Sequence, residues 1–305
     1  MSGVPKNDPK IAVVFATMNR WQTAVTCVRA LAAQTRPPEL VIVADNVSSD
    51  ETFSELSALI GMPFEFIVHR MEENLGNAGG VHAAMEHAFS KNVDAVWILD
   101  DDSWPRPDAL AAMLAEPLDP CVIRHPLQID PATGKFTWPL QIAQNGDFHL
   151  IDSIAEMPPS HSTPSRGVWT GALVSRHVRE TIGPVMAELF IRGEDEEYPW
   201  RMAQAGFKHE AILAALMDHP GPPDIVRWDF FGKHFFFERG LADWKLYYKV
   251  RNMVWLKRKQ SGAGKALVIF AAYVTAVSRF DGFHRLPLLW IAFCDGWHGR
   301  LGKMR

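Results

Sequence analysis

At 305 residues, the chain is long enough to bury the core of one large α/β domain with additions or of two modest domains, and 48% of its residues are hydrophobic. Its formal net charge of −4 at pH 7 argues against a nucleic-acid-binding protein, because such proteins usually carry a clearly basic domain. The three cysteines form no CxxC pair and no zinc-site or disulfide pattern, so we expect a reducing, cytoplasmic environment.

Membrane-spanning segments are not expected from the sequence. The first ten residues are polar and lack the apolar core of a signal peptide, so we expect the protein to stay inside the cell. The longest late apolar stretch, 266–277, falls short of the roughly 18–20 residues that cross a bilayer. Contact with a membrane surface is compatible with both observations.

The first hundred residues alternate apolar, β-like runs with segments of helical periodicity. Strands are predicted at 11–17, 40–46, 64–70 and 95–101. Helices are predicted between them, within 24–32, 53–60 and 78–89. This alternation is typical of an α/β protein with a parallel sheet flanked by helices, in which ligands gather at the carboxyl ends of the strands.

The rest of the chain divides near residue 222. Two further β-like stretches, 122–129 and 167–176, are separated by a Pro- and Ser-rich connector at 156–167 that we expect to be mobile. Beyond 222 the composition shifts toward aromatic and basic residues. We therefore predict a domain at 1–222 that carries the ligand sites, followed by a helical, aromatic and basic region at 223–305.

Polar residues follow three of the predicted strands, at the points where the strands end. Because the carboxyl ends of parallel strands meet in one crevice, we expect these side chains to lie together and to bind a ligand. They are Thr17, Asn19, Arg20, Asp45, Asn46 and the acidic triplet Asp100, Asp101 and Asp102.

The acidic triplet indicates a metal site. Adjacent carboxylates in a crevice repel one another unless a cation neutralises them, and oxygen ligands suit Mg²⁺ or Mn²⁺, whose open positions are commonly filled by phosphate oxygens. Side chains alternate along an extended strand end, so Asp100 and Asp102 are the predicted ligand pair and Asp101 points the other way. A nucleotide substrate follows from this interpretation. The alternative is a solvated acidic turn before the helix that begins near Asp108.

A glycine-rich segment at 74–85 leads into the third predicted helix. Gly76, Gly79 and Gly80 permit close backbone approach, and the helix start offers free N–H groups to a diphosphate or a ribose. The segment matches neither G-x-G-x-x-G nor a Walker A loop. A tight turn without a ligand is the alternative.

Four acidic residues, 194–197, lie at a predicted helix start. Acids are common there because of the helix dipole alone. The preceding residues Phe190, Ile191 and Gly193 indicate a turn that emerges from the interior and aims a carboxylate inward, as a general base for a sugar hydroxyl requires. His219 follows an apolar run, where a histidine is usually structural.

Seven segments in this order resemble the family 2 glycosyltransferases of GT-A fold, and more narrowly the bacterial galactofuranosyltransferases of actinobacterial cell-wall galactan synthesis. They are VVFATMNR, VADN, NLGNAGG, WILDDD, WTGALVSR, FIRGEDEEYPWR and DHP, within residues 10–222. The resemblance implies a Rossmann-like, mostly parallel sheet flanked by helices, with a helical C-terminal region.

The resemblance also implies roles for individual residues. The implied donor-binding residues are Thr17, Arg20, Asp45, Asn77, Gly79 and Asp101. The implied metal ligands are Asp100, Asp102 and His219, with Mn²⁺ or Mg²⁺ as the ion. The implied catalytic residues are Asp195 as base and Glu194 as its neighbour, two roles that could be exchanged, and the implied acceptor residues are Trp169 and Gly171.

The function implied is inverting transfer of galactofuranose from UDP-galactofuranose to a glycan acceptor linked to polyprenyl diphosphate, in cell-wall biogenesis. A rhamnosyltransferase that uses dTDP-rhamnose is the close alternative. A nucleotidyltransferase and a non-catalytic carbohydrate-binding protein are alternatives of other classes. The former usually carries a glycine-rich loop with Lys or Arg after its first strand, and the latter needs no separate metal and acid clusters.

The segment 244–260 combines aromatic and basic residues on one predicted helix. Such a helix can lie at an anionic membrane surface, and the later apolar segment 286–293 offers a second patch. A lipid-linked acceptor would then be met at the inner face of the cell membrane. The alternative is a helix that packs its apolar side on the catalytic domain and leaves a solvated basic side.

Overall fold

The computed structural model describes residues 8–222, 224–230 and 233–304. The chain divides into two compact units. The first unit contains the residues up to Val185 together with Tyr198–Gly221, and the second contains Met186–Glu197 and the residues from Pro222 onward. The second unit therefore takes in a segment, 186–197, that the sequence-based division had left with the N-terminal domain.

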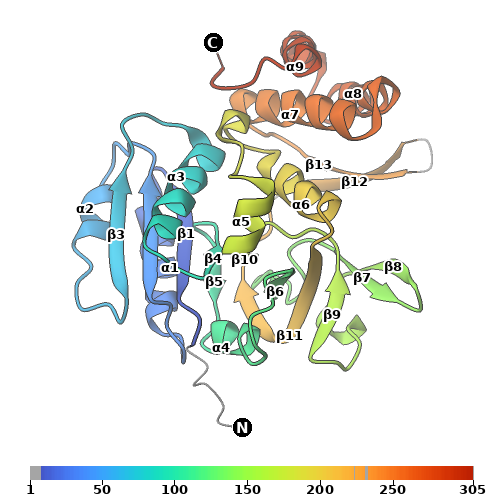
Figure 1. Ribbon diagram of the computed structural model, residues 1–305. Coiled ribbons are helices and arrows are strands. Elements are labelled where there is room, and N and C mark those ends of the chain that lie inside the picture. The colour runs from blue at the N-terminus through green and yellow to red at the C-terminus, as the bar shows by residue number, and fades with distance from the viewer. Residues whose placement is uncertain (1–7, 223, 231–232, 305) are drawn as a thin grey trace. The chain divides into compact units, whose positions relative to one another are not determined.

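The first unit is built on one mixed sheet with the strand order β3-β2-β1-β4-β10-β6-β11-β9-β7-β8, with β5 paired to β11 (Figure 1). The pairs among β1 to β4 are parallel, as is the pair β6 and β11, while the remaining pairs are antiparallel. The strands are β1 (Ile11–Thr17), β2 (Leu40–Asp45), β3 (Glu65–Arg70), β4 (Ala95–Ile98), β5 (Trp104–Pro105), β6 (Val122–Ile129), β7 (Leu140–Gln144), β8 (Asp147–Ile151), β9 (Ser162–Ser165), β10 (Leu173–Ser175) and β11 (Lys208–Asp218).

Helices cover both faces of the parallel part of this sheet (Figure 1). Every residue of β1, β2 and β4 is buried, as expected for central strands covered on both sides. The predicted α/β fold with a mostly parallel sheet is confirmed. The helices are α1 (Trp21–Ala32), α2 (Thr52–Ser57), α3 (Gly76–Ser90), α4 (Ala109–Met113), α5 (Arg176–Ile182), α6 (Glu194–Gln204), which continues from the second unit into the first, and the short η1 (Ile154–Glu156).

The Pro- and Ser-rich connector is more ordered than its composition predicts. It contains β9, which pairs antiparallel with β11 and, at Ser165, with β7. Proline is tolerated there because β9 pairs with β7 only at Ser165, so that Pro164 is at an edge position on that side. The second β-like stretch, 167–176, in turn forms a strand only over Leu173–Ser175.

The second unit combines a β-hairpin with helices. The sequence predicts a helical region from 223 onward, and that prediction is wrong for 225–230 and 233–238, which form the hairpin. The hairpin pairs β12 (Ile225–Phe230) with β13 (Lys233–Glu238). The helices are η2 (Ala187–Leu189), α7 (Asp243–Ser261), α8 (Ala263–Phe280), η3 (Phe283–Arg285) and α9 (Leu286–His298).

Helix α7, which contains the aromatic and basic segment 244–260, is the packing helix of the second unit. Tyr247, Tyr248 and Val254 are buried in a core that they share with residues of α8 and α9. Even Arg251 is only 1% exposed, and its guanidinium donates to the carbonyl oxygens of Leu189 and Gly302. The apolar side of α7 therefore packs on α8 and α9 within the second unit, and contact of its basic side with a membrane stays a prediction.

Helix α8 contains the longest late apolar stretch of the sequence. Its 18 residues include the apolar stretch 266–277, and among the residues that the structure describes it is the one helix long and apolar enough to cross a membrane. This criterion rests on length and composition alone. Only 22% of its residues are fully buried inside the protein, and the others are either half-buried against the core of the second unit or exposed.

Candidate metal and nucleotide site

The acidic triplet lies in a tight turn, not on an extended strand end. Strand β4 ends at Ile98, and the N–H of Ser103 donates to the carbonyl oxygen of Asp100, 3.1 Å away. The turn brings the chain back to β5, where Trp104 pairs with Asp218 at the end of β11. This pairing brings His219, the residue that follows β11, to the side of the triplet.

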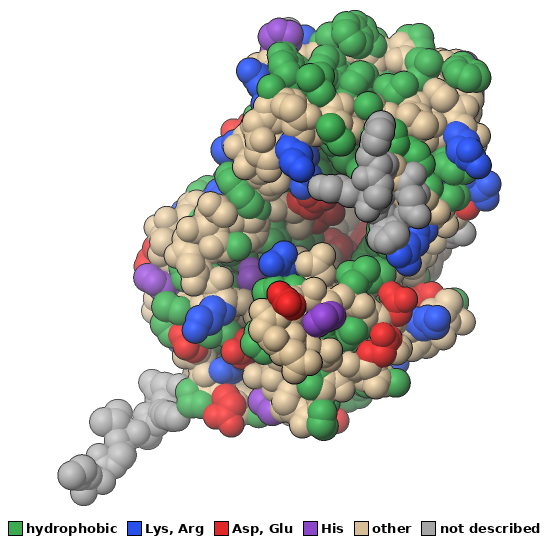
Figure 2. Space-filling model, turned by 90° about the vertical axis from the view of Figure 1, so that its right-hand side faces the viewer, with side chains coloured by type: hydrophobic (Ala, Val, Ile, Leu, Met, Phe, Trp, Pro, Cys, Tyr) green, Lys and Arg blue, Asp and Glu red, His purple; other side chains and the backbone are tan. Residues whose placement is uncertain are grey.

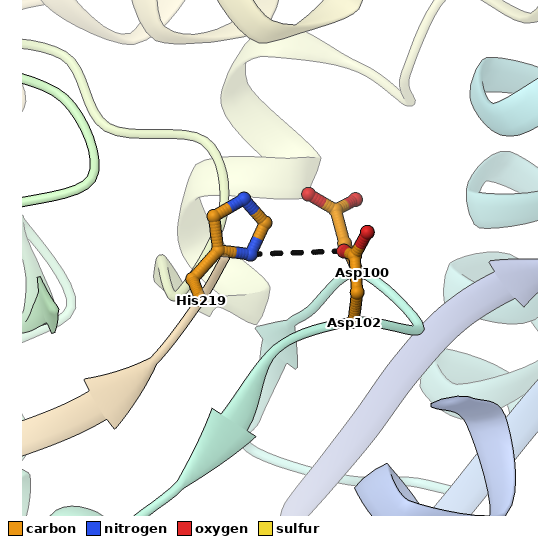
Figure 3. Close-up of side chains that lie close together, drawn as sticks. All are labelled: Asp100, Asp102 and His219. Carbon is orange, nitrogen blue, oxygen red and sulfur yellow. Dashed lines mark ion pairs between the residues drawn. The ribbon is translucent and has the colours of Figure 1, made fainter. Parts of the chain in front are cut away.

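Asp100, Asp102 and His219 form a group that can hold a metal ion (Figure 3). Each offers one ligand atom, and these atoms lie within 4.8 Å of one another. Nδ1 of His219 is 3.6 Å from Oδ1 of Asp102, and the carboxylates of Asp100 and Asp102 both extend toward the imidazole ring. Two carboxylate oxygens and an imidazole nitrogen suit Mn²⁺ and also Mg²⁺, so the residues present fit the predicted ion.

Two residues that the sequence did not single out hold this group in place. The hydroxyl of Thr170 donates to Oδ2 of Asp100 at 2.6 Å, and Oγ of Ser103 lies 2.9 Å from Nδ1 of His219. Desolvation, and then the nearby Asp102 carboxylate, raise the pKa of Asp100. A cation at this position would relieve that repulsion.

Asp101 faces away from the group, toward the end of β1. Its side chain is buried, and Oδ2 accepts a hydrogen bond from the hydroxyl of Thr17 at 2.8 Å. Arg20 lies 2.8 Å from Asp101 and 2.7 Å from Asp102, so one guanidinium links two members of the triplet. Desolvation raises the pKa of Asp101 to about 7 against the opposing effect of Arg20. The structure thus brings Thr17, Arg20 and Asp101 together.

One carboxylate oxygen of Asp45 has no hydrogen-bond donor among the described residues, as we expect of a residue that binds a ligand. It pairs with Thr17 across β1 and β2 and is fully buried. Oδ1 accepts the N–H of Ser48 at 3.1 Å, whereas Oδ2 has no hydrogen bond within the described part of the chain and lies 3.8 Å from Arg70 Nη1. A buried carboxylate oxygen without a donor is costly, so a ligand N–H would fit there.

The glycine-rich segment is explained by close packing as well as by a ligand. A Cβ on Gly79 would collide with Cβ of Leu75, and one on Gly80 would lie 2.6 Å from Cβ of Ala16. Gly80 therefore lets α3 approach the sheet, whereas Gly79 leaves room for the side chain of Leu75, just before the helix. Asn77, in the first turn of α3, is partly exposed, and Gly76 has φ +70°, which favours glycine.

The two predicted acceptor residues are both buried. Trp169 is 5% exposed and packs edge-on against Tyr198, with ring centroids 5.9 Å apart. Its Nε1 has no hydrogen-bond partner among the described residues. Gly171 has φ +89°, and a Cβ there would lie 2.8 Å from Pro126 Cδ, so packing alone explains this glycine. Contact of either residue with an acceptor stays a prediction.

The predicted catalytic acids lie in the second unit, in the first turn of α6. Glu194 is buried, whereas Asp195 is exposed and its Oδ1 accepts the N–H of Gly193 at 2.9 Å. Gly193 has φ +140°, and a Cβ there would lie 2.8 Å from Cβ of Asn252. The amide of Asn252 lies 2.6–3.0 Å from the carbonyl oxygens of Leu189, Ile191 and Arg192. Asn252 therefore organises the turn before the acids, and no sequence motif had marked it.

Comparisons with known proteins bear on the family and the fold. Residues 12–173, just over half of the chain, match the model of glycosyl transferase family 2. The galactofuranosyltransferases GlfT1 of Mycolicibacterium smegmatis and Mycobacterium tuberculosis are 26% and 29% identical over 224 residues, which cover 69% of this chain and 70% of each relative. The solved mannosyltransferase PcManGT from Pyrobaculum calidifontis, in complex with GDP-Man and Mn²⁺, superposes with a TM-score of 0.55 at 18% identity, covering 96% of this chain and 76% of that one.

The family match and the structural likeness rest on different evidence, one on residues and the other on the course of the backbone. The family match includes β4 and the turn with Asp100 and Asp102 but ends before β11 and His219, whereas the structural likeness covers 96% of the chain. The chain belongs to glycosyl transferase family 2 and has the GT-A fold.

Proposed function

We propose that this family 2 enzyme is an inverting, metal-dependent galactofuranosyltransferase that moves galactofuranose from UDP-galactofuranose to a glycan linked to polyprenyl diphosphate. The likeness to the two GlfT1 proteins supports the sugar. The observation that carries the proposal is the group of Asp100, Asp102 and His219 at the carboxyl end of the sheet. A metal-bound nucleotide diphosphate is the ligand that such a group suits.

The donor nucleotide would bind along the ends of β1 and β2. Oδ2 of Asp45, which has no hydrogen-bond partner among the described residues, is an acceptor for the imide N–H of a pyrimidine base, which uracil and thymine share. The side chain of Arg20 is 47% exposed while it contacts Asp101 and Asp102. Its solvent-exposed part can therefore contact the sugar nucleotide while both ion pairs remain in place. We assign Thr17, Asn77, Gly79 and Asp101 to the same donor site.

In the proposed reaction, the acceptor hydroxyl attacks the anomeric carbon as the nucleotide diphosphate departs, so the configuration inverts. Bound Mn²⁺ or Mg²⁺ would neutralise charge on the departing diphosphate. Asp195 removes the proton of the attacking hydroxyl. Its exposure favours it over the buried Glu194, and because Gly193 holds Oδ1, Oδ2 is the oxygen we assign to the proton. We assign the reaction to the cytoplasm, at the inner face of the cell membrane.

A donor panel tests the proposal. The enzyme is mixed with Mn²⁺, a lipid-linked glycan acceptor and either UDP-galactofuranose or dTDP-rhamnose, and the released nucleotide and the lengthened glycan are measured. We expect UDP release and sugar transfer from UDP-galactofuranose alone. Transfer only from dTDP-rhamnose would assign the alternative sugar. Release of inorganic pyrophosphate from a nucleoside triphosphate and a sugar phosphate would instead indicate a nucleotidyltransferase.

A further inference from the structure

We propose that the outward side of α8, η3 and α9 docks in the plane of an anionic lipid membrane. This α8–α9 face consists of Leu267, Val268, Phe283, Trp290 and Ile291, each between 45% and 73% exposed. In Figure 2, hydrophobic side chains gather at the top of the view, the level at which Figure 1 draws these helices. The proposal gives the lipid-linked acceptor of the proposed function a surface, but it depends on neither donor nor acceptor.

The charge of the chain is distributed as an anionic partner requires. Residues 239–305 contain 13 Lys and Arg against three Asp and no Glu, whereas residues 1–238 contain 18 Lys and Arg against 32 Asp and Glu. Each of the three aspartates also makes an ion pair with an arginine. The overall charge of −4 therefore conceals a strongly basic C-terminal region, and lysines and arginines near a membrane add attraction to anionic lipids.

Two of these basic residues flank the apolar face. Lys265 is in the first turn of α8 and Arg279 in its last turn, and both are exposed. Arg279 shares a helix face with Val268, at spacings of three and four through the exposed residues Ala271 and Thr275. An apolar strip that ends in basic side chains is typical of helices that lie at the boundary of headgroups and acyl chains.

The packing of α8 favours docking in the membrane plane over crossing it. Its opposite side buries Ala266, Ala276 and Val277 in the core that α7 and α9 share. Phe270 of α8 packs against Phe293 of α9, with ring centroids 4.3 Å apart, and Phe293 also packs against Trp290. A spanning α8 would have to leave this core, whereas docking in the plane buries only side chains that are already exposed.

Vesicle cosedimentation of the full-length protein tests the proposal. The probes are vesicles of phosphatidylcholine alone and of an equimolar mixture of phosphatidylcholine and phosphatidylglycerol. We expect binding to the mixture, weaker binding to phosphatidylcholine, and weakening by salt. Trp290→Ser with Ile291→Ser should lower the partition coefficient by about tenfold or more, because two apolar anchors are lost. Lys265→Glu with Arg279→Glu should weaken binding to the mixture alone.

Matched variants in the first unit are the controls. Ile60 and Trp138 are 86% and 39% exposed, so Ile60→Ser with Trp138→Ser removes the same two residue types from another surface. Lys135→Glu with Lys208→Glu reverses two exposed charges elsewhere. Both controls should bind like the wild type, and circular dichroism of every variant checks that it is folded.

Three outcomes would overturn the proposal. The first is that the wild-type protein binds neither vesicle, or that the control variants lose as much binding as the variants of the α8–α9 face. The second is bound protein that alkaline carbonate fails to extract, which would assign α8 as a spanning helix. The third is self-association in analytical ultracentrifugation that Trp290→Ser with Ile291→Ser abolishes, which would assign the face to contact between copies. None of these measurements involves sugar transfer, so failure of the proposed function leaves the test valid.

Discussion

Substitution of Gly80 by alanine would separate the two explanations of the glycine-rich segment. The added Cβ would lie 2.6 Å from Cβ of Ala16 and 2.9 Å from Nδ2 of Asn46. Ala16 belongs to β1 and can move only with its strand, and Asn46 is held by hydrogen bonds to Gly76 O and Leu75 N at 3.1 and 3.2 Å. Helix α3 or the sheet must therefore shift.

The size of the effect follows from two opposing contributions. Overpacking of a buried contact costs about 1–3 kcal/mol, and two contacts below 3.0 Å favour the upper part of that range. Replacing glycine by alanine inside a helix returns roughly 1 kcal/mol. We therefore expect the free energy of unfolding of Gly80→Ala to fall by about 1–2 kcal/mol.

Urea unfolding at equilibrium measures this change, with nucleotide affinity measured in parallel. Gly264→Ala is the control, because no atom lies within 4 Å of the Cβ it would add. Ala16→Gly in the Gly80→Ala background should recover part of the loss, since it removes one of the two contacts. A Gly80→Ala protein with wild-type stability and weakened nucleotide binding would refute the packing argument and favour a ligand cradle.

Three further predictions concern the site and its surroundings. Asp102→Asn removes a carboxylate of the metal group, and we expect the Mn²⁺ affinity measured by isothermal titration to fall by more than about tenfold. Loss of residues that only support the ligands already lowers metal affinity by about that factor. Unchanged affinity would exclude Asp102 as a ligand. Asp195→Asn should lower kcat by about 10²–10⁴-fold with UDP affinity nearly unchanged, and strong loss of UDP affinity would reassign the residue to donor binding. Burial lowers the pKa of His125 to about 4, from 6.5, so the folded protein favours the neutral ring. The free energy of unfolding is therefore highest above about pH 6.5, where the ring is neutral in both states, and falls as the pH drops toward about 4, because the unfolded chain is protonated first. His125 should thus account for about 3 kcal/mol of acid destabilisation, and a His125→Gln variant with the same pH dependence of unfolding as the wild type would contradict this.

The alternation of apolar runs determined the fold of the N-terminal half, because a buried parallel strand and an amphipathic helix impose different local periods. The same pattern predicted that polar residues such as Thr17 and Asp45 end neighbouring strands, and their pairing across β1 and β2 brings them side by side. The metal pair Asp100 and Asp102 was also predictable, although for a different geometry. A turn, not an extended strand, separates Asp101 from its neighbours.

The C-terminal region shows where composition misleads. A helix rich in tyrosine, tryptophan, lysine and arginine looks the same in sequence whether it packs inside a protein or lies on a membrane. In this chain α7 is buried because Arg251 and Asn252 have carbonyl partners from distant segments, and those partners satisfy the polar groups that burial would otherwise leave unpaired. The apolar residues left outside are on α8 and α9.

By itself, the sequence determined what depends on neighbours along the chain: the strands, the helices and the acidic turn with its charge. Only the tertiary structure decided what depends on partners far apart in the chain. Asp100 and His219 are separated by more than a hundred residues, and Thr170 lies between them in sequence, yet all three meet at one edge of the sheet. The pairing of β5 with β11 produces this meeting, and such a register is set by packing over the whole sheet, which no local pattern encodes.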